Sequence, residues 1–103
     1  MKIQHEKANG LCLAILKECT FLDELGKVKY NCKKPGIILH TATSDWSNDI
    51  LYRHIRLGLR DKNVLDYFDT EFYKTSIHIN LKKEYVNHID DLETLLELQN
   101  FWS

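Results

Sequence analysis

The residues best able to do chemistry are the cysteines and histidines, and their spacing matches no catalytic or metal-binding motif. The chain has three cysteines, Cys12, Cys19 and Cys32, and five histidines, with no CxxC pair and no HExxH motif. It also lacks a GxSxG turn and a glycine-rich phosphate loop. A dyad of Cys32 with His40 or His78 would depend on folding to bring the two side chains together. We therefore expect reduced thiols, no bound metal, no cofactor and no enzymatic activity.

A row of arginines is the sharpest charged feature of the sequence. Arg53, Arg56 and Arg60 are three and four residues apart, so a helix would place them on one face. Guanidinium groups in such a row suit a phosphate backbone or an acidic partner. Alternatively, Asp49 and the acidic second half of the chain neutralise the row as ordinary surface ion pairs. The candidate nucleic-acid-binding residues are Arg53, Arg56, Arg60, Lys33 and Lys34.

The second half of the chain places acidic side chains among aromatic ones. Residues 61–103 hold nine Asp and Glu against four Lys and Arg, whereas residues 1–60 hold six against ten. Aromatic anchors surrounded by acids would suit a basic protein partner, because aromatic side chains dominate interface energetics. Equally, the same aromatics would fill a small core. The candidate partner-binding residues are Asp66, Tyr67, Phe68, Asp69, Glu71, Asp90, Glu93 and Glu97, with the two aromatics as anchors.

The first half of the chain reads as a helix followed by a β-hairpin. Apolar residues recur at three- and four-residue spacing over residues 3–25, which predicts an amphipathic helix. Two strand patterns, at residues 27–32 and 37–41, flank Pro35 and Gly36. This arrangement predicts a hairpin with Pro35 and Gly36 at the centre of a type II turn.

The second half reads as a helix, an ambiguous segment, a strand and a final helix. Residues 43–60 predict a helix capped at 43–45, with His54 hydrogen-bonded on its apolar face. Residues 61–72 suit either a short helix or a strand. Alternation over residues 75–81 predicts a strand, and Asn87 is expected to cap the last helix. The polar face of that strand carries Ser76, His78 and Asn80.

Length and composition limit the fold class. A chain of 103 residues with 44% apolar residues, four glycines and one proline predicts a single domain over residues 1–103 with its own core. The element order (α-β-β-α-short α or β-β-α) predicts an α+β domain, an antiparallel sheet of about three strands packed by three main helices. A winged-helix-like variant fits the same order, with residues 44–60 as the recognition helix and 64–81 as the wing. No apolar run is long enough for a membrane span and no secretory signal is evident, so we expect a cytoplasmic protein.

Two function classes fit these observations. The leading expectation is a small protein-binding module, an inhibitor or toxin-neutralising immunity-type protein that acts by surface occlusion. It follows from the small size, the polarised charge and the missing catalytic motifs. The alternative is a winged-helix-like nucleic-acid-binding protein that uses the arginine row. A net charge of −1 gives this alternative no support from bulk electrostatics.

Overall fold

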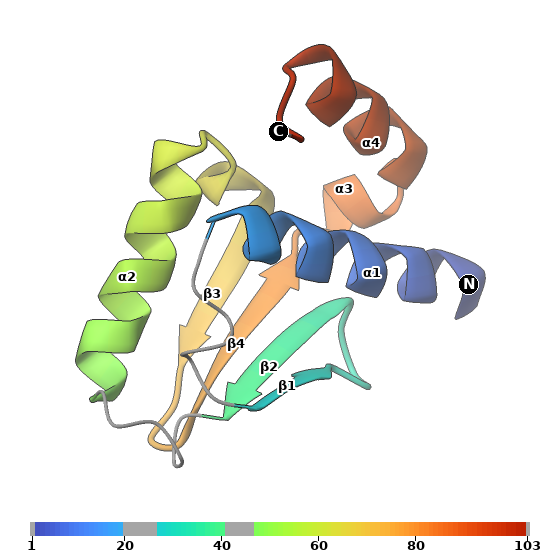
Figure 1. Ribbon diagram of the computed structural model, residues 1–103. Helices are drawn as coiled ribbons and strands as arrows, with labels where there is room; N and C mark the ends of the chain where they lie inside the picture. Colours follow the sequence, from blue (N-terminus) through green and yellow to red (C-terminus); the bar gives the residue numbers. More distant parts are fainter. Residues whose placement is uncertain (1, 20–26, 41–46, 103) are drawn as a thin grey trace.

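The computed structural model describes residues 2–19, 27–40 and 47–102, and there the chain forms helices and a four-stranded antiparallel sheet (Figure 1). In chain order the elements are α1 (Lys2–Cys19), β1 (Lys27–Tyr30), β2 (Gly36–His40), α2 (Asn48–Asp61), the 3-10 helix η2 (Leu65–Tyr67), β3 (Phe68–Phe72), β4 (Ser76–Leu81), α3 (Lys83–Val86) and α4 (Ile89–Leu98). This order confirms the predicted α+β class. The fourth strand arises because the ambiguous segment 61–72 contains both a short helix and a strand.

The sheet joins two hairpins in the order β1-β2-β4-β3. Ile37 of β2 and Thr70 of β3 both pair with Ile79, so β4 is an interior strand. Its side chains Ile77 and Ile79 are fully buried. The winged-helix variant is therefore wrong, because residues 64–81 supply half of the sheet instead of a projecting wing.

One face of the sheet carries the hydrophobic core, against which α1 and α2 pack. The buried strand residues on this face are Ile37, Leu39, Phe68, Ile77, Ile79 and Leu81. The helices contribute Ala8, Leu11, Cys12, Ile15 and Leu16 from α1, and Leu51, Ile55 and Leu59 from α2. The apolar spacing of the first helix is thus confirmed as far as Cys19, while the remainder of its predicted range, 20–25, lies outside the described residues.

An asparagine organises the loop between β1 and β2. The backbone N–H of Asn31 donates to the carbonyl of Gly36 at 3.0 Å. Oδ1 of Asn31 accepts from the backbone N–H groups of Lys33 and Lys34 at 2.9 and 3.3 Å, as Asx side chains commonly do in turns. Gly36 is the first residue of β2. The predicted type II turn centred on Pro35 and Gly36 is therefore wrong, because the loop is closed around the Asn31 side chain.

The structure differs from the sequence prediction in where α2 and α4 begin and in the exposure of His54. Ser47 caps α2, and its hydroxyl accepts from the N–H of Ile50 at 3.4 Å; the predicted cap at 43–45 lies outside the described residues. His54 is exposed, which contradicts its predicted place in the core. Asn87 lies at the end of α3, and α4 begins at Ile89. These differences shift helix boundaries without changing the element order.

Candidate functional site

Four polar residues of β3 and β4 gather on the sheet face opposite the core. Alternate side chains of a strand point to opposite faces, so the neighbours of the buried residues share the other side. Strand register places Glu71 directly opposite His78, and Asp69 directly opposite Asn80. We call this side the polar face. Register between strands, which the sequence does not state, brings the four residues together.

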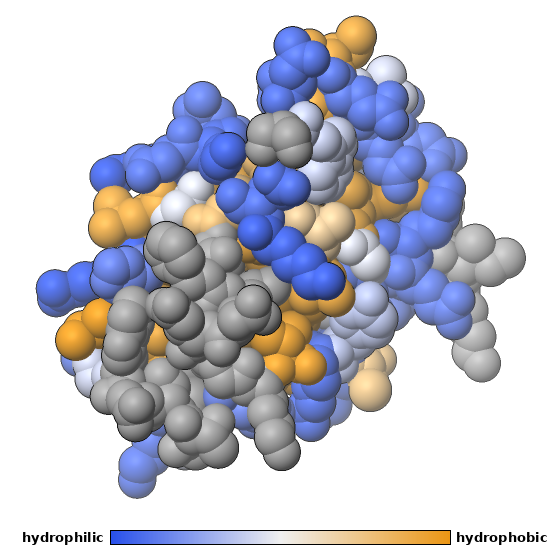
Figure 2. Space-filling model, viewed as in Figure 1, coloured by the Kyte–Doolittle hydropathy of each residue, from blue (hydrophilic) through white to orange (hydrophobic). Residues whose placement is uncertain are grey.

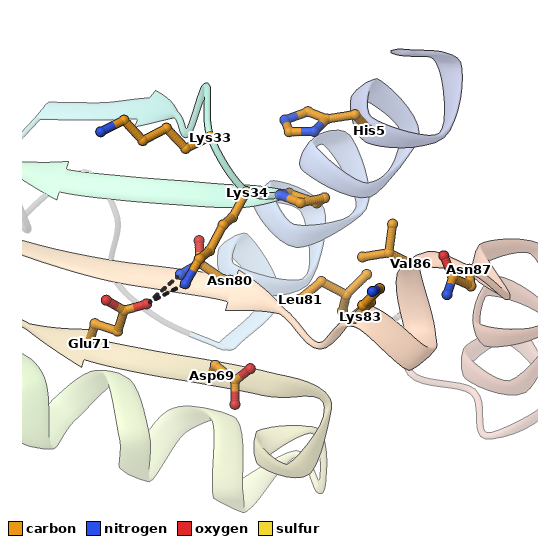
Figure 3. Close-up of a pocket in the computed structure, with 11 residues that line it drawn as sticks. His5, Lys33, Lys34, Asp69, Glu71, Asn80, Leu81, Lys83, Val86 and Asn87 are labelled. Carbon is orange, nitrogen blue, oxygen red and sulfur yellow. Dashed lines mark hydrogen bonds and ion pairs between the residues drawn. The ribbon is translucent and has the colours of Figure 1, made fainter. Parts of the chain in front are cut away.

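Glu71 is held by three donors at the centre of the polar face. The Tyr73 hydroxyl donates to Oε2 of Glu71, and Nδ2 of Asn80 donates to Oε1 at 3.2 Å. Nζ of Lys34 forms an ion pair with the same Oε1 at 3.5 Å (Figure 3). The Tyr73 hydrogen bond, with the nearby charge of Lys34, lowers the pKa of the Glu71 carboxyl. At neutral pH this carboxylate is ionised and fixed in orientation.

A network of buried amide groups holds Asn80, one of the donors to Glu71, in place. Nδ2 of Asn31 donates to Oδ1 of Asn80 at 3.0 Å, and both asparagines are buried. The backbone N–H of Gly36 donates to Oδ1 of the buried Asn9 in α1. Because buried polar groups are costly to leave unpaired, this network resists rearrangement. It ties α1, the β1–β2 loop and β4 to the position of Glu71.

His78 and Tyr73 complete the polar face with their rings in contact. The ring centroids lie 4.6 Å apart at an interplanar angle of 50°. Burial lowers the pKa of His78 against the opposing effect of Glu71, so the imidazole is neutral at neutral pH. The hydrogen bond to Glu71 raises the pKa of Tyr73. The cluster thus presents a neutral imidazole, a protonated phenol and a carboxylate, a set suited to directional hydrogen bonding.

A cavity of about 680 Å³ adjoins Glu71, a volume typical of ligand sites. It is lined by residues of α1, the β1–β2 loop, β3, β4 and the segment around α3: His5, Lys33, Lys34, Pro35, Asp69, Glu71, Asn80, Leu81, Lys83, Val86 and Asn87 (Figure 3). Lysines that the sequence assigned to nucleic acid therefore share one cavity with carboxylates that it assigned to a basic protein. The cavity carries both signs of charge.

The aromatic anchors predicted from the sequence are not on this surface. Phe68 is only 4% exposed and belongs to the hydrophobic core, so its predicted role as a partner anchor is wrong. Tyr67 is half-buried and packs edge-on against the ring of Tyr85 at 4.8 Å. The exposed aromatic of the polar face is Tyr73, which is 46% exposed. The sequence prediction chose Tyr67 and Phe68 as anchors and not Tyr73, because the role of Tyr73 depends on the cross-strand position of Glu71 and His78.

The predicted acidic residues separate into three places. Asp69 and Glu71 lie on β3, and Asp66 is exposed in η2. On α4, Asp90 forms an ion pair with Lys7 of α1 at 2.9 Å. The same helix carries the other two predicted acids, Glu93 and Glu97.

The predicted nucleic-acid set also divides. Arg53, Arg56 and Arg60 are exposed on α2, whereas Lys33 and Lys34 lie in the β1–β2 loop. Figure 1 shows α2 and this loop well separated, on opposite sides of the sheet. A surface that uses all five residues at once is therefore not formed.

The cysteines are separate and free. Burial raises the pKa of Cys12 to about 12 and that of Cys19 to about 11, while Cys32 is exposed in the β1–β2 loop. His40 is the last residue of β2, whereas Cys32 lies in the loop that precedes the first residue of this strand. The hypothetical dyad of Cys32 and His40 is therefore not assembled. Within the described ranges, no group of three or more His, Cys, Asp and Glu side chains could hold a metal ion.

No helix among the described residues combines the length and apolarity that crossing a membrane requires. No protein-family model matches the chain, and no curated protein or solved structure is significantly similar to it.

Proposed function

We propose that this chain is a small protein-binding module whose binding surface is the polar face around Glu71, together with the adjoining cavity. The observation that carries the proposal is the fixed Glu71 carboxylate, whose side chain remains 33% exposed while Tyr73, Asn80 and Lys34 hold it. A charged group that is already oriented loses little conformational entropy when a partner binds. Such a group favours specific docking.

Tyr73 supplies the anchor for this surface. Its ring is substantially exposed beside Glu71, and tyrosine is among the residues that contribute most to interface energy. The phenol hydroxyl is already directed at Glu71. A partner side chain that covers the ring would therefore meet an aromatic surface and a fixed carboxylate at once.

The charges of the cavity define the kind of partner surface that fits. Asp69 is exposed beside Glu71 and suits a partner arginine or lysine, because guanidinium and carboxylate groups form strong paired hydrogen bonds. Lys33 and Lys83, also exposed, suit an acidic group. A protein segment with charges of both signs matches this pattern better than a polyanion, which the two carboxylates would repel.

Occupation of a partner surface fits the site better than catalysis. Its main carboxylate is engaged by three neighbours and has a lowered pKa, which makes it a weak general base. The proposed action is steric occlusion of the partner, as an inhibitor or immunity-type protein acts.

The test is site-specific photo-crosslinking in the cells that naturally produce the chain. A photoreactive residue at Thr75, exposed in the β3–β4 turn, is expected to capture one dominant protein, identified by mass spectrometry. The same group at Leu98, which is 77% exposed on α4, is the position control and should not capture it.

Charge reversal then links the adduct to the proposed surface. Asp69→Lys is expected to weaken binding of the identified partner by about tenfold or more. Asp66→Lys, which makes the same charge change in η2, should leave the affinity within about twofold. Equal effects of the two substitutions, or equal adducts from Thr75 and Leu98, would refute the polar face as the binding surface.

A further inference from the structure

A second surface, formed by α2 and the neighbouring η2, is separate from the polar face. A groove of about 460 Å³ runs along this helix, and we call it the α2 groove. It is lined by Tyr52, Arg53, Arg56, Leu57, Arg60 and Leu65. The first and last arginines are seven residues apart, which places them about 10 Å apart along the helix axis. Figure 2 shows hydrophobic and hydrophilic side chains interspersed along this edge of the molecule.

The arginines of the groove are not neutralised by the described part of the chain. Arg53, Arg56 and Arg60 are all exposed, and none of them forms an ion pair with a described carboxylate. Asp49, which the sequence offers as a partner for Arg53, forms no ion pair within the same residues. The pairing that would make this row an ordinary solvated surface is therefore not made.

Apolar side chains line the groove together with the guanidinium groups. Leu57 is 44% exposed, and Leu65 is half-buried beneath the groove. Exposing leucine on a charged helix face gains nothing in water, whereas a partner that covers the side chain recovers the hydrophobic free energy. The groove thus combines an apolar floor with a cationic rim.

We propose that the α2 groove binds an acidic protein segment in which carboxylates flank an apolar side chain. The arginine guanidinium groups would donate paired hydrogen bonds to the carboxylates, and the apolar side chain would cover Leu57 and Leu65. Charge complementarity and the apolar floor favour this occupant, and its binding does not depend on the function proposed for the polar face.

The contacts of the Tyr52 ring argue against single-stranded nucleic acid as the occupant of the α2 groove. The guanidinium carbon of Arg56 lies 5.7 Å from the centroid of the Tyr52 ring. The same ring contacts that of Phe72 at 5.2 Å, and its hydroxyl lies 3.1 Å from Oγ1 of Thr70. With these contacts made, the ring offers no open platform for base stacking, on which single-strand binding depends.

The test uses a fluorescein-labelled synthetic peptide in which glutamate alternates with leucine and phenylalanine, and measures fluorescence anisotropy with the full chain at low salt. Saturable binding is expected, and the double substitution Arg53→Glu and Arg56→Glu should weaken it by about tenfold or more. Leu57→Ser should weaken it by several-fold without changing the charge. Circular dichroism of each variant establishes that it is folded.

Matched controls distinguish the α2 groove from general attraction. Lys17→Glu with Lys29→Glu makes the same charge change on exposed lysines of α1 and β1 and should leave peptide affinity within about twofold. A peptide with lysine in place of glutamate should not bind. Equal losses in the two double variants, or displacement of the peptide by an equal concentration of single-stranded DNA, would overturn the proposal.

Discussion

Replacing Gly36 by alanine tests the close approach of β2 to β4. Gly36 pairs with Asn80 across β2 and β4 and has a φ of +158°. An added Cβ would lie 2.6 Å from Cα of Asn80 and 2.7 Å from its Oδ1, and it would also overlap the carbonyl oxygen of Ile79. Two of these atoms belong to the backbone, so they cannot move aside without separating the strands.

The expected cost of Gly36→Ala follows from three effects. Overpacking a tight site costs about 1–3 kcal/mol, and a backbone conformation that favours glycine costs a further ~1–3 kcal/mol. Alanine recovers about 0.4–1 kcal/mol by restricting the unfolded chain. We therefore expect the free energy of unfolding to fall by about 1–6 kcal/mol, a large fraction of the stability of a small domain.

Urea denaturation followed by circular dichroism measures this change, and Gly10→Ala is its matched control. A Cβ on Gly10, in α1, would meet no atom within 4 Å. The control should therefore be neutral or stabilising, by up to about 1 kcal/mol, because alanine favours helix. If Gly36→Ala were as stable as Gly10→Ala, the close packing of β2 on Asn80 would be refuted.

Three further predictions concern titration, thiol reactivity and the core. Because the folded pKa values of His78 and Glu71 both lie below their ordinary values of 6.5 and 4.5, the unfolded chain binds more protons and stability should fall with pH below about 6.5. Urea titrations at a series of pH values measure this decline in the free energy of unfolding. His78→Gln should reduce the decline at its higher-pH end and Glu71→Gln at its lower-pH end, and unchanged profiles would contradict the assigned contacts. Ellman's reagent should label Cys32 rapidly and Cys12, whose pKa is about 12, only as the fold opens; a rapid phase that persists in Cys32→Ser would be inconsistent with this order. Phe68→Ala should lower the free energy of unfolding by about 3–5 kcal/mol, and a fully stable variant would argue against its place in the core.

Local patterns predicted the element order because they record which side of an element is buried. The spacing of Ala8, Cys12 and Ile15 requires a helix with one buried face, and all three are fully buried in α1. The alternation of Ile77 and Ile79 with polar residues likewise predicted β4 correctly. His54 is exposed and was misplaced because its spacing puts it at the edge of the apolar stripe, and periodicity alone does not set the width of the part that is buried.

The candidate site depends on contacts between residues distant in sequence. Lys34 and Glu71 are 37 residues apart, and Asn31 and Asn80 are 49 apart. The sequence showed that His78 and Asn80 share one strand face, but nothing local to them identifies β3 as their neighbour. Phe68 was predicted on the partner surface but is buried, because an aromatic residue next to acidic residues in the sequence can point to either face of a strand.

By itself the sequence determined the α+β class, the buried faces of α1 and β4 and the arginine row on one helix, since these follow from spacing within a few residues. Tertiary structure alone decided that Glu71 faces His78, that cationic and anionic residues share a cavity, and that the arginines stand apart from the loop lysines. The physical reason is register: one step along a strand exchanges its two faces, and only packing of the whole core selects between them.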